Sequence, residues 1–89
     1  MTENSRKSEP EKRKSPMKIS AVARLADVSK QTVEYYIMLG LIRPYRDNKT
    51  RRRTFDDSHV RRIRLIRKLN ASGYTLREIR EIWLKKKGP

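Results

Sequence analysis

Apolar side chains recur at helical spacing in two short segments near the start of the sequence. The first is the run 21–26, which follows Ser20, a residue whose hydroxyl can accept hydrogen bonds from the free amides of a first helical turn. This pattern predicts a helix over residues 20–26. The second is the segment 30–38, in which one face is apolar at i, i+3, i+4 spacing and consists of Val33, Tyr36 and Ile37.

A polar residue and a glycine mark the boundaries of the second predicted helix. Ser29 is placed to cap the second helix, and Gly40 is placed to end it in the left-handed conformation that glycine adopts at little cost. We expect Tyr36 in the core and Tyr35 on the outer face. Two short helices joined by a three-residue turn form the skeleton of a helix-turn-helix.

The next segment has the pattern of a hairpin and not of a helix. Pro44 has no amide proton to donate, and Asp-Asn-Lys-Thr at 47–50 is a turn composition. We expect short strands at 42–46 and 52–55 on either side of this turn. The hairpin is therefore a candidate two-stranded wing.

Two further helices are predicted after the hairpin. Acidic and hydroxyl residues at 56–58 suit a helix N-terminus, and apolar residues repeat through 58–70 at Val60, Ile63, Ile66 and Leu69. Gly73 ends this helix, and Thr75 with Glu78 forms a capping box for a fourth helix. That helix has one apolar face, which we expect in the core, made of Leu76, Ile79, Ile82 and Trp83. The predicted fold class is mainly α: helix-turn-helix, two-stranded wing and two further helices.

Length and charge add a domain boundary and a class of partner. With 89 residues and a hydrophobic fraction of 35%, the chain supports one small domain, predicted at 17–87. Residues 1–16 lack a large apolar side chain after Met1 and are expected to be a disordered basic tail. Lys and Arg number 24 against 10 Asp and Glu, which gives a net charge of +14. Such a self-repelling surface favours a polyanionic partner, and nucleic acid is the first candidate.

The sequence lacks the residues that a metal site, an enzyme active site or a membrane-spanning segment would need. There is no Cys and one His, His59, so no metal site or other cofactor is expected, and we expect His59 to be a surface or capping residue. One His and three Gly supply neither a nucleophile with its base nor a phosphate-binding glycine loop, so the chain is not expected to be an enzyme. No apolar run approaches the roughly 20 residues that cross a bilayer, so no membrane partner and a cytoplasmic, nucleoid-associated location are expected.

The order of motifs resembles the DNA-binding domain of MerR-type transcription regulators over residues 17 to about 84. The motifs are V-S-x-x-T at 28–32 with a tyrosine pair, G-L-I-x-P at 40–44, R-x-F at 53–55 and G-Y-T-L-R-E-I at 73–79. The resemblance implies a winged helix-turn-helix whose second helix enters the major groove while the wing grips flanking phosphates. Members of the family usually act as dimers that bend and untwist a promoter.

The sequence departs from the family pattern at three places. Glu34 stands where the family usually has Arg before the tyrosine pair, and a carboxylate there would repel phosphate. Arg51 and Arg52 stand where the wing usually has Gly-Tyr. The family's long dimerising helix and effector region would follow residue 85. We therefore expect a monomer or weak homodimer and no small-molecule effector site in this chain.

The candidate contacts are polar side chains of the second helix and basic side chains of the wing. Gln can pair with adenine and Lys with guanine, while a tyrosine phenol can donate to phosphate. Guanidinium groups bind phosphate oxygens in a fork and release counterions, with a salt slope of about −5 for roughly six phosphates. On the third helix we favour the two arginines nearest the wing. The predicted DNA-binding residues are Lys30, Gln31, Thr32, Tyr35, Arg43, Arg46, Lys49, Arg51, Arg52, Arg53, Arg61 and Arg62.

The residues lead us to expect a sequence-specific binder of double-stranded DNA that acts as a transcription regulator. An excisionase-like or architectural DNA-bending factor stays open, because it would use the same contacts. A protein-interaction adaptor also stays open, because winged helices are reused for docking and an acidic partner would suit the charge.

Overall fold

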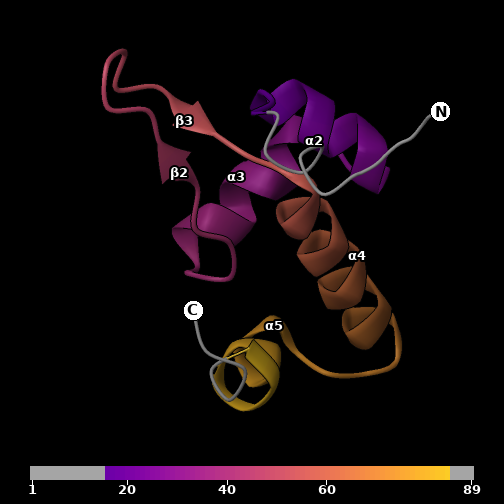
Figure 1. Ribbon diagram of the computed structural model, residues 1–89. Helices are drawn as coiled ribbons and strands as arrows, with labels where there is room; N and C mark the ends of the chain where they lie inside the picture. The colour runs from indigo at the N-terminus through magenta and orange to yellow at the C-terminus, as the bar shows by residue number, and fades with distance from the viewer. Residues whose placement is uncertain (1–15, 85–89) are drawn as a thin grey trace, which may run out of the picture.

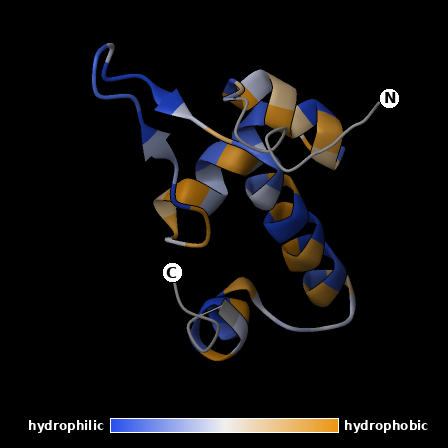
Figure 2. Cartoon of the chain, viewed as in Figure 1, coloured by the Kyte–Doolittle hydropathy of each residue, from blue (hydrophilic) through white to orange (hydrophobic). Residues whose placement is uncertain are grey.

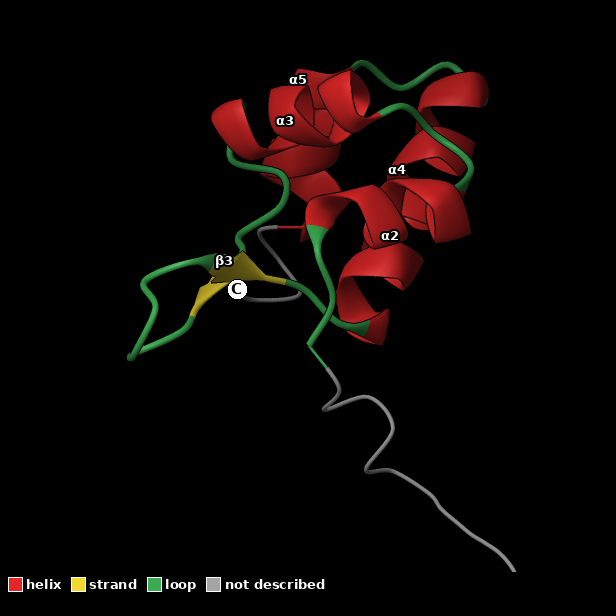
Figure 3. Cartoon of the chain, turned by 90° about the horizontal axis from the view of Figure 1, so that it is seen from above, coloured by secondary structure: helices red, strands yellow, loops and turns green. Residues whose placement is uncertain are grey.

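The computed structural model describes residues 16–84, so residues 85–89 and all but the last residue of the predicted tail at 1–16 lie outside the described part. The helices pack together, and a small hairpin projects away from them to one side (Figures 1 and 3). The elements in chain order are α2 (Ile19–Ala26), α3 (Lys30–Met38), β2 (Tyr45–Arg46), β3 (Arg53–Thr54), α4 (Asp57–Ala71), α5 (Leu76–Glu78) and the π-helical segment η2 (Ile79–Leu84). The predicted order of helix, helix, wing, helix, helix is confirmed.

The helix-turn-helix consists of α2 and α3, and α2 also packs against α4. Ser29 caps α3 as predicted, because its Oγ accepts a hydrogen bond of 3.0 Å from the amide of Thr32. The helix predicted at 20–26 is present as α2, but the predicted cap was wrong: Ser20 lies inside the helix, and the N-cap is Lys18, whose side chain makes no capping bond. The reason lies outside the segment, since Met17 pairs its backbone with Phe55 and holds the chain extended up to Lys18.

The two predicted helix stops are present in the left-handed conformation. Gly40 follows α3 with a φ of +82°, and Gly73 follows α4 with a φ of +114°. At the end of α2 a non-glycine residue, Asp27, takes the same conformation with a φ of +61°. The turn between α2 and α3 therefore has its sharp bend at an aspartate, which tolerates this region better than most side chains.

The wing is an antiparallel hairpin whose strands are shorter than predicted. Tyr45 pairs with Thr54, and Arg46 pairs with Arg53. The predicted strands at 42–46 and 52–55 were too long, because residues 42–44, Arg52 and Phe55 lie outside β2 and β3. Ile42 is buried in the core, and Phe55 pairs with Met17 instead of with β2.

One hydrophobic core joins the helix-turn-helix, the base of the wing and the later helices. Its fully buried large side chains are Val22, Val33, Leu41, Phe55, Ile63, Ile66 and Ile79. Tyr36 is 6% exposed and belongs to this core, as predicted. Figure 2 shows the contrast with the hairpin, which is hydrophilic along nearly all of its length. The wing is thus held to the domain at its base and has no apolar contact of its own at the tip.

The last helix begins as predicted and then departs from α geometry. Thr75 and Glu78 form the capping box, with hydrogen bonds of 3.0 and 2.9 Å. The single α turn of α5 is followed by the π-helical segment η2. Its wider turn changes which residues share a face. Ile79 is fully buried, whereas Ile82 is 48% exposed, so the predicted core position of Ile82 was wrong.

Candidate nucleic-acid interface

The outer face of α3 carries the predicted base contacts away from the core. Lys30, Gln31 and Tyr35 are exposed, while Val33 and Tyr36 are buried on the opposite face. Thr32 is half-buried, and its hydroxyl lies 3.0 Å from the hydroxyl of Ser29. The helix therefore offers an amine, an amide and a phenol to a partner, while the threonine hydroxyl is already hydrogen-bonded to Ser29.

The tip of the wing is ordered by hydrogen bonds to its own backbone. The Asp47 carboxylate accepts from the amides of Thr50 at 2.9 Å and Lys49 at 2.7 Å, and these two bonds hold the pKa of Asp47 below its usual range. Arg51 has a φ of +64°, a conformation that a glycine adopts without cost. Arg46 donates to the backbone carbonyl of Arg51 at 3.1 Å. Polar contacts with the backbone therefore hold the turn, and the side chains of Lys49, Arg51 and Arg52 stay exposed to solvent.

Most of the predicted basic contacts have uncommitted side chains. Within residues 16–84 the side chains that form neither a hydrogen bond nor an ion pair include those of Lys30, Arg43, Lys49, Arg51, Arg52, Arg61 and Arg62. Arg62 is half-buried, and the others are exposed. None of these seven cations forms an ion pair with an anion of the described residues, so they are available to an external anion.

The structure brings two of these cations together beside the base of the wing. A hollow of about 310 Å³ is lined by Arg43, Pro44 and Tyr45 from the segment leading into the hairpin and by Ser58, His59 and Arg62 from α4. Arg62 is thereby placed beside Arg43, as its position near the wing predicted. Arg61 does not line this hollow.

Arg53 differs from the other wing arginines because it is paired inside the protein. Its two terminal nitrogens donate to the two carboxylate oxygens of Glu34 at 3.0 and 2.8 Å. This bond lowers the pKa of Glu34 and raises that of Arg53. The pair joins α3 to β3 across 19 residues of sequence. The sequence marked Glu34 as a misfit but offered no signal for its partner.

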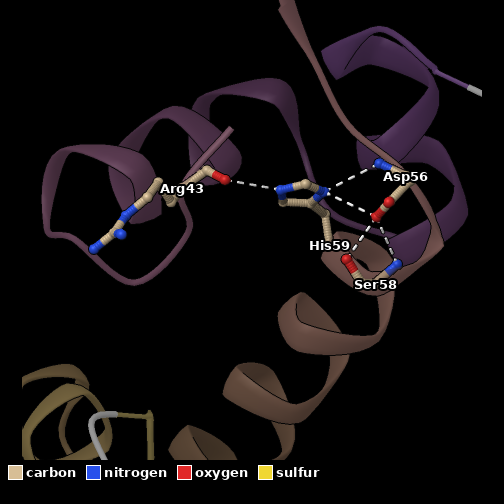
Figure 4. Close-up of polar contacts among 4 residues, drawn as sticks. All are labelled: Arg43, Asp56, Ser58 and His59. Carbon is tan, nitrogen blue, oxygen red and sulfur yellow. Dashed lines mark hydrogen bonds and ion pairs between the residues drawn. The ribbon is translucent and has the colours of Figure 1, made fainter. Parts of the chain in front are cut away.

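His59 is the second link between the wing and the helices (Figure 4). Its Nδ1 accepts from the backbone amide of Asp56 at 3.0 Å, so Nε2 carries the proton and donates to the backbone carbonyl of Arg43 at 2.9 Å. The ring also meets Tyr45 and Phe55 edge-on, with centroids 4.9 and 5.2 Å away. The expected capping role is confirmed, but with 6% exposure His59 is not a surface residue.

Asp56 completes the cap of α4 from the other side. Burial raises the pKa of this carboxyl, but hydrogen bonds from the side chain and backbone of Ser58 and the neighbouring His59 outweigh burial, so the pKa lies below its ordinary value. The ionised form of Asp56 is therefore favoured by folding. The first turn of α4 is fixed beside the base of the wing.

Several arginines of the later helices close the ends of earlier helices. Arg64 donates to the carbonyl of Leu25 at 2.9 Å, and Arg67 donates to that of Asp27 at 3.2 Å, both at the end of α2. Arg80 donates to the carbonyl of Leu39, which follows α3, at 3.0 Å. Cations suit the C-terminal ends of helices, where carbonyls lack partners. These arginines hold the helix-turn-helix on the later helices.

Within residues 16–84, no helix is both long and apolar enough to cross a bilayer. The same residues contain no group of three or more His, Cys, Asp or Glu side chains arranged to hold a metal ion.

Comparisons with known proteins agree with the motif order and the architecture. The heavy metal-dependent transcription regulator 2 of Rhizobium meliloti (strain 1021) is 29% identical over 66 residues, and the HTH-type transcriptional regulator HmrR of Sinorhizobium medicae (strain WSM419) is 30% identical over 66 residues. Each match covers 74% of this chain and 45% of the relative, so the chain spans about half the length of these curated relatives.

A solved structure supports the same assignment at the level of the fold. The transcription regulator PbrR691 from Ralstonia metallidurans CH34, crystallised in complex with lead(II), is similar with a TM-score of 0.72 and 31% identity. The match covers 80% of this chain and 56% of that one. The family model described as "MerR HTH family regulatory protein" matches residues 17–86. With its winged helix-turn-helix and this match, the chain belongs to the MerR HTH family.

Proposed function

We propose that this chain binds double-stranded DNA in a sequence-specific manner and acts as a transcription regulator. In the proposed complex α3 enters the major groove and the wing contacts the flanking phosphates. The observation that carries the proposal is the set of exposed, unpaired wing cations Arg43, Lys49, Arg51 and Arg52 beside the polar face of α3. Like charges crowded in one hairpin repel each other, and phosphates relieve that repulsion.

Each group of side chains has a distinct part in this proposal. Lys30 and Gln31 contact base edges, for which amine and amide groups are suited. Tyr35, 47% exposed, donates its hydroxyl to a phosphate. The hydroxyl of Thr32, which lies 3.0 Å from that of Ser29, is a second phosphate contact. The wing cations and the two arginines at the start of α4 also bind phosphates. Arg62 and Arg43 line the same hollow and bind phosphate there together, whereas Arg61 lies outside that hollow and binds phosphate separately. A cytoplasmic, nucleoid-associated location follows from this role.

Selection from a random pool of duplexes tests the proposal. The purified chain should enrich a common sequence, and its affinity for the winners should exceed that for scrambled duplexes by about 10³-fold or more at one salt concentration. Enrichment of inverted half-sites would indicate a cooperating pair of chains, and a single half-site would indicate a monomer. A chain that enriches no sequence and binds winners and scrambled DNA equally is not a sequence-specific regulator.

Two variants separate the base contacts from the phosphate contacts. Gln31→Ala should reduce the preference for the selected sequence by about 1–3 kcal/mol at the base pair it contacts. Arg52→Gln should weaken binding to winners and scrambled duplexes alike, because phosphates are the same in both. If Gln31→Ala weakened both kinds of duplex equally, Gln31 would not be a base contact.

A further inference from the structure

We infer that Arg53 is the counter-charge of Glu34 in the DNA interface and does not bind phosphate, so that Glu34 determines which wing arginines do. This inference rests on the proposed function. The fork between the two side chains uses both carboxylate oxygens and both terminal nitrogens. Their side chains are 34% and 50% exposed for Arg53 and Glu34, so the pair lies at the surface and not in the core.

The position of Glu34 makes it a liability for a DNA-binding helix. It lies on the exposed part of α3, between Lys30 one turn before it and Tyr35 next to it. An unpaired carboxylate at this position would approach the phosphates that the neighbouring side chains are proposed to bind. Arg53 and Lys30 both favour its charged form, and Arg53 is the one that bonds to it. The carboxylate is therefore neutralised locally and α3 can approach the duplex.

Transfer of Arg53 to a phosphate would reverse this arrangement. The guanidinium would exchange one bidentate anion for another, which gains little. The exchange would also leave Glu34 charged and unpaired beside the DNA backbone, which is unfavourable. Arg53 therefore stays with Glu34 when DNA binds. Phosphate contact is left to the wing cations without an internal anion, Arg51 and Arg52 among them.

The pair has a second consequence for the hairpin itself. Arg46 and Arg53 lie directly opposite each other in the β2–β3 pairing, where like charges are destabilising. Glu34 offsets the charge of one, while the other turns toward the carbonyl of Arg51. Glu34 thus supports the strand pairing and joins it to α3.

A double-mutant cycle on DNA affinity tests the inference. The four proteins are the wild type, Arg53→Gln, Glu34→Gln and the double variant, measured on a selected duplex at several salt concentrations. Arg53→Gln should weaken binding about tenfold because it exposes Glu34, and Glu34→Gln should restore the affinity of the double variant to within about threefold of wild type. Glu34→Gln alone should tighten binding, because it removes an anion and frees Arg53 for a phosphate, with a salt slope steeper by about 1.

Arg52→Gln is the matched control, since it removes a neighbouring arginine that has no internal partner. It should weaken binding, make the salt slope shallower by about 1, and combine additively with Glu34→Gln. If the Arg53→Gln/Glu34→Gln protein stays as weak as Arg53→Gln, or if Arg53→Gln alone makes the slope shallower by about 1, Arg53 binds phosphate and the inference is wrong. Failure of the wild type to bind any duplex would instead overturn the proposed function.

A measurement on the free protein tests the pair without DNA. The carboxyl carbon of Glu34 can be followed by NMR through an acid titration. It should titrate at higher pH in Arg53→Gln than in the wild type, and Arg52→Gln should leave its titration unchanged. Equal titration of Glu34 in the wild type and in Arg53→Gln would contradict the pairing on which the inference depends.

Discussion

Individual charged residues in this small protein stabilise turns and helix ends, which the net charge alone does not indicate. Arg51 takes a left-handed backbone conformation to shape the wing tip, at a position where the family pattern has glycine. Arg64 closes α2, and Asp47 closes the turn of the hairpin through the amides of Lys49 and Thr50. Surface charge and local structure are therefore coupled at single residues.

Asp56→Asn tests this coupling through pH. Folding lowers the pKa of Asp56 below its ordinary value of 3.8, so its stabilising contribution is complete above that value and is lost as the pH falls through the folded-state pKa. Asparagine keeps a capping oxygen but not the charge. We predict that Asp56→Asn lowers the free energy of unfolding at pH 7 by about 0.5–1 kcal/mol, and that the difference from wild type shrinks below pH 3.8.

Urea unfolding of the wild type and of Asp56→Asn across this pH range is the measurement. Asp57→Asn is the control, because Asp57 lies in the same first turn and has no side-chain bond at the cap. A difference for Asp56→Asn that stays constant from neutral to acid pH would show that its charge is not what stabilises α4.

At the scale of elements, two side-chain links position the wing, one at the segment that leads into β2 and one at β3. His59 ties the segment entering β2 to α4, and the Glu34–Arg53 pair ties β3 to α3. Both links join elements far apart in the sequence. They hold a hairpin that has little apolar surface of its own.

His59→Phe should loosen the first link while preserving its ring contacts. Phenylalanine can still meet Tyr45 and Phe55 edge-on, but it leaves the carbonyl of Arg43 and the amide of Asp56 without their partner. We predict a loss of about 2 kcal/mol in the free energy of unfolding, because two partly buried polar groups become unsatisfied. Thermal or urea unfolding measures the loss, and hydrogen exchange at the amide of Asp56 should accelerate.

Ser58→Ala provides the comparison, since it removes a hydroxyl that bonds to Asp56 but leaves both bonds of His59. Its loss should be the smaller of the two. A His59→Phe protein as stable as the wild type would show that the imidazole contributes packing alone.

The elements themselves could be predicted where the signal is local. The cap at Ser29, the left-handed Gly40 and the box of Thr75 with Glu78 depend on residues within one turn of each other, and all three are present. The N-cap of α2 was missed because Met17 pairs with Phe55, far along the chain.

The site was predictable only in part for the same reason. The outer face of α3 follows from its apolar periodicity, so the exposure of Lys30, Gln31 and Tyr35 could be expected. The partner of a charged side chain does not follow from any periodicity. Arg53 with Glu34 and Arg80 with the carbonyl of Leu39 are contacts across 19 and 41 residues, which only the folded chain defines.

For the whole molecule, the net charge overstates the number of cationic side chains that are available to bind DNA. Of the chain's +14, part is committed internally: Arg53 is paired with Glu34, and Arg64, Arg67 and Arg80 are bound to helix-terminal carbonyls. Uncommitted cations also lie away from the proposed interface, namely Lys18, Arg24, Lys68 and Arg77. The uncommitted cations that the proposal assigns to DNA lie on the wing, on α3 and on the first turns of α4.

The salt dependence of affinity measures how many of these cations engage phosphates. About six phosphates would be neutralised by the uncommitted cations to which phosphate contact is assigned, Arg43, Lys49, Arg51, Arg52, Arg61 and Arg62, which predicts a slope of log affinity against log salt of about −5. Fluorescence anisotropy with a labelled duplex between roughly 50 and 200 mM salt gives this slope. A slope near zero would be incompatible with a grip on the DNA backbone by the wing.

The most direct test of the central claim, that α3 and the wing together seat the protein on duplex DNA, is an NMR titration of the full chain with a selected double-stranded oligonucleotide. The account predicts that the amide signals of residues 30–35 and 46–52 move together as DNA is added, while those of α5 stay in place. If the signals of α3 and the wing remain unmoved at a DNA concentration that saturates binding, the duplex lies elsewhere on the protein and the account is wrong.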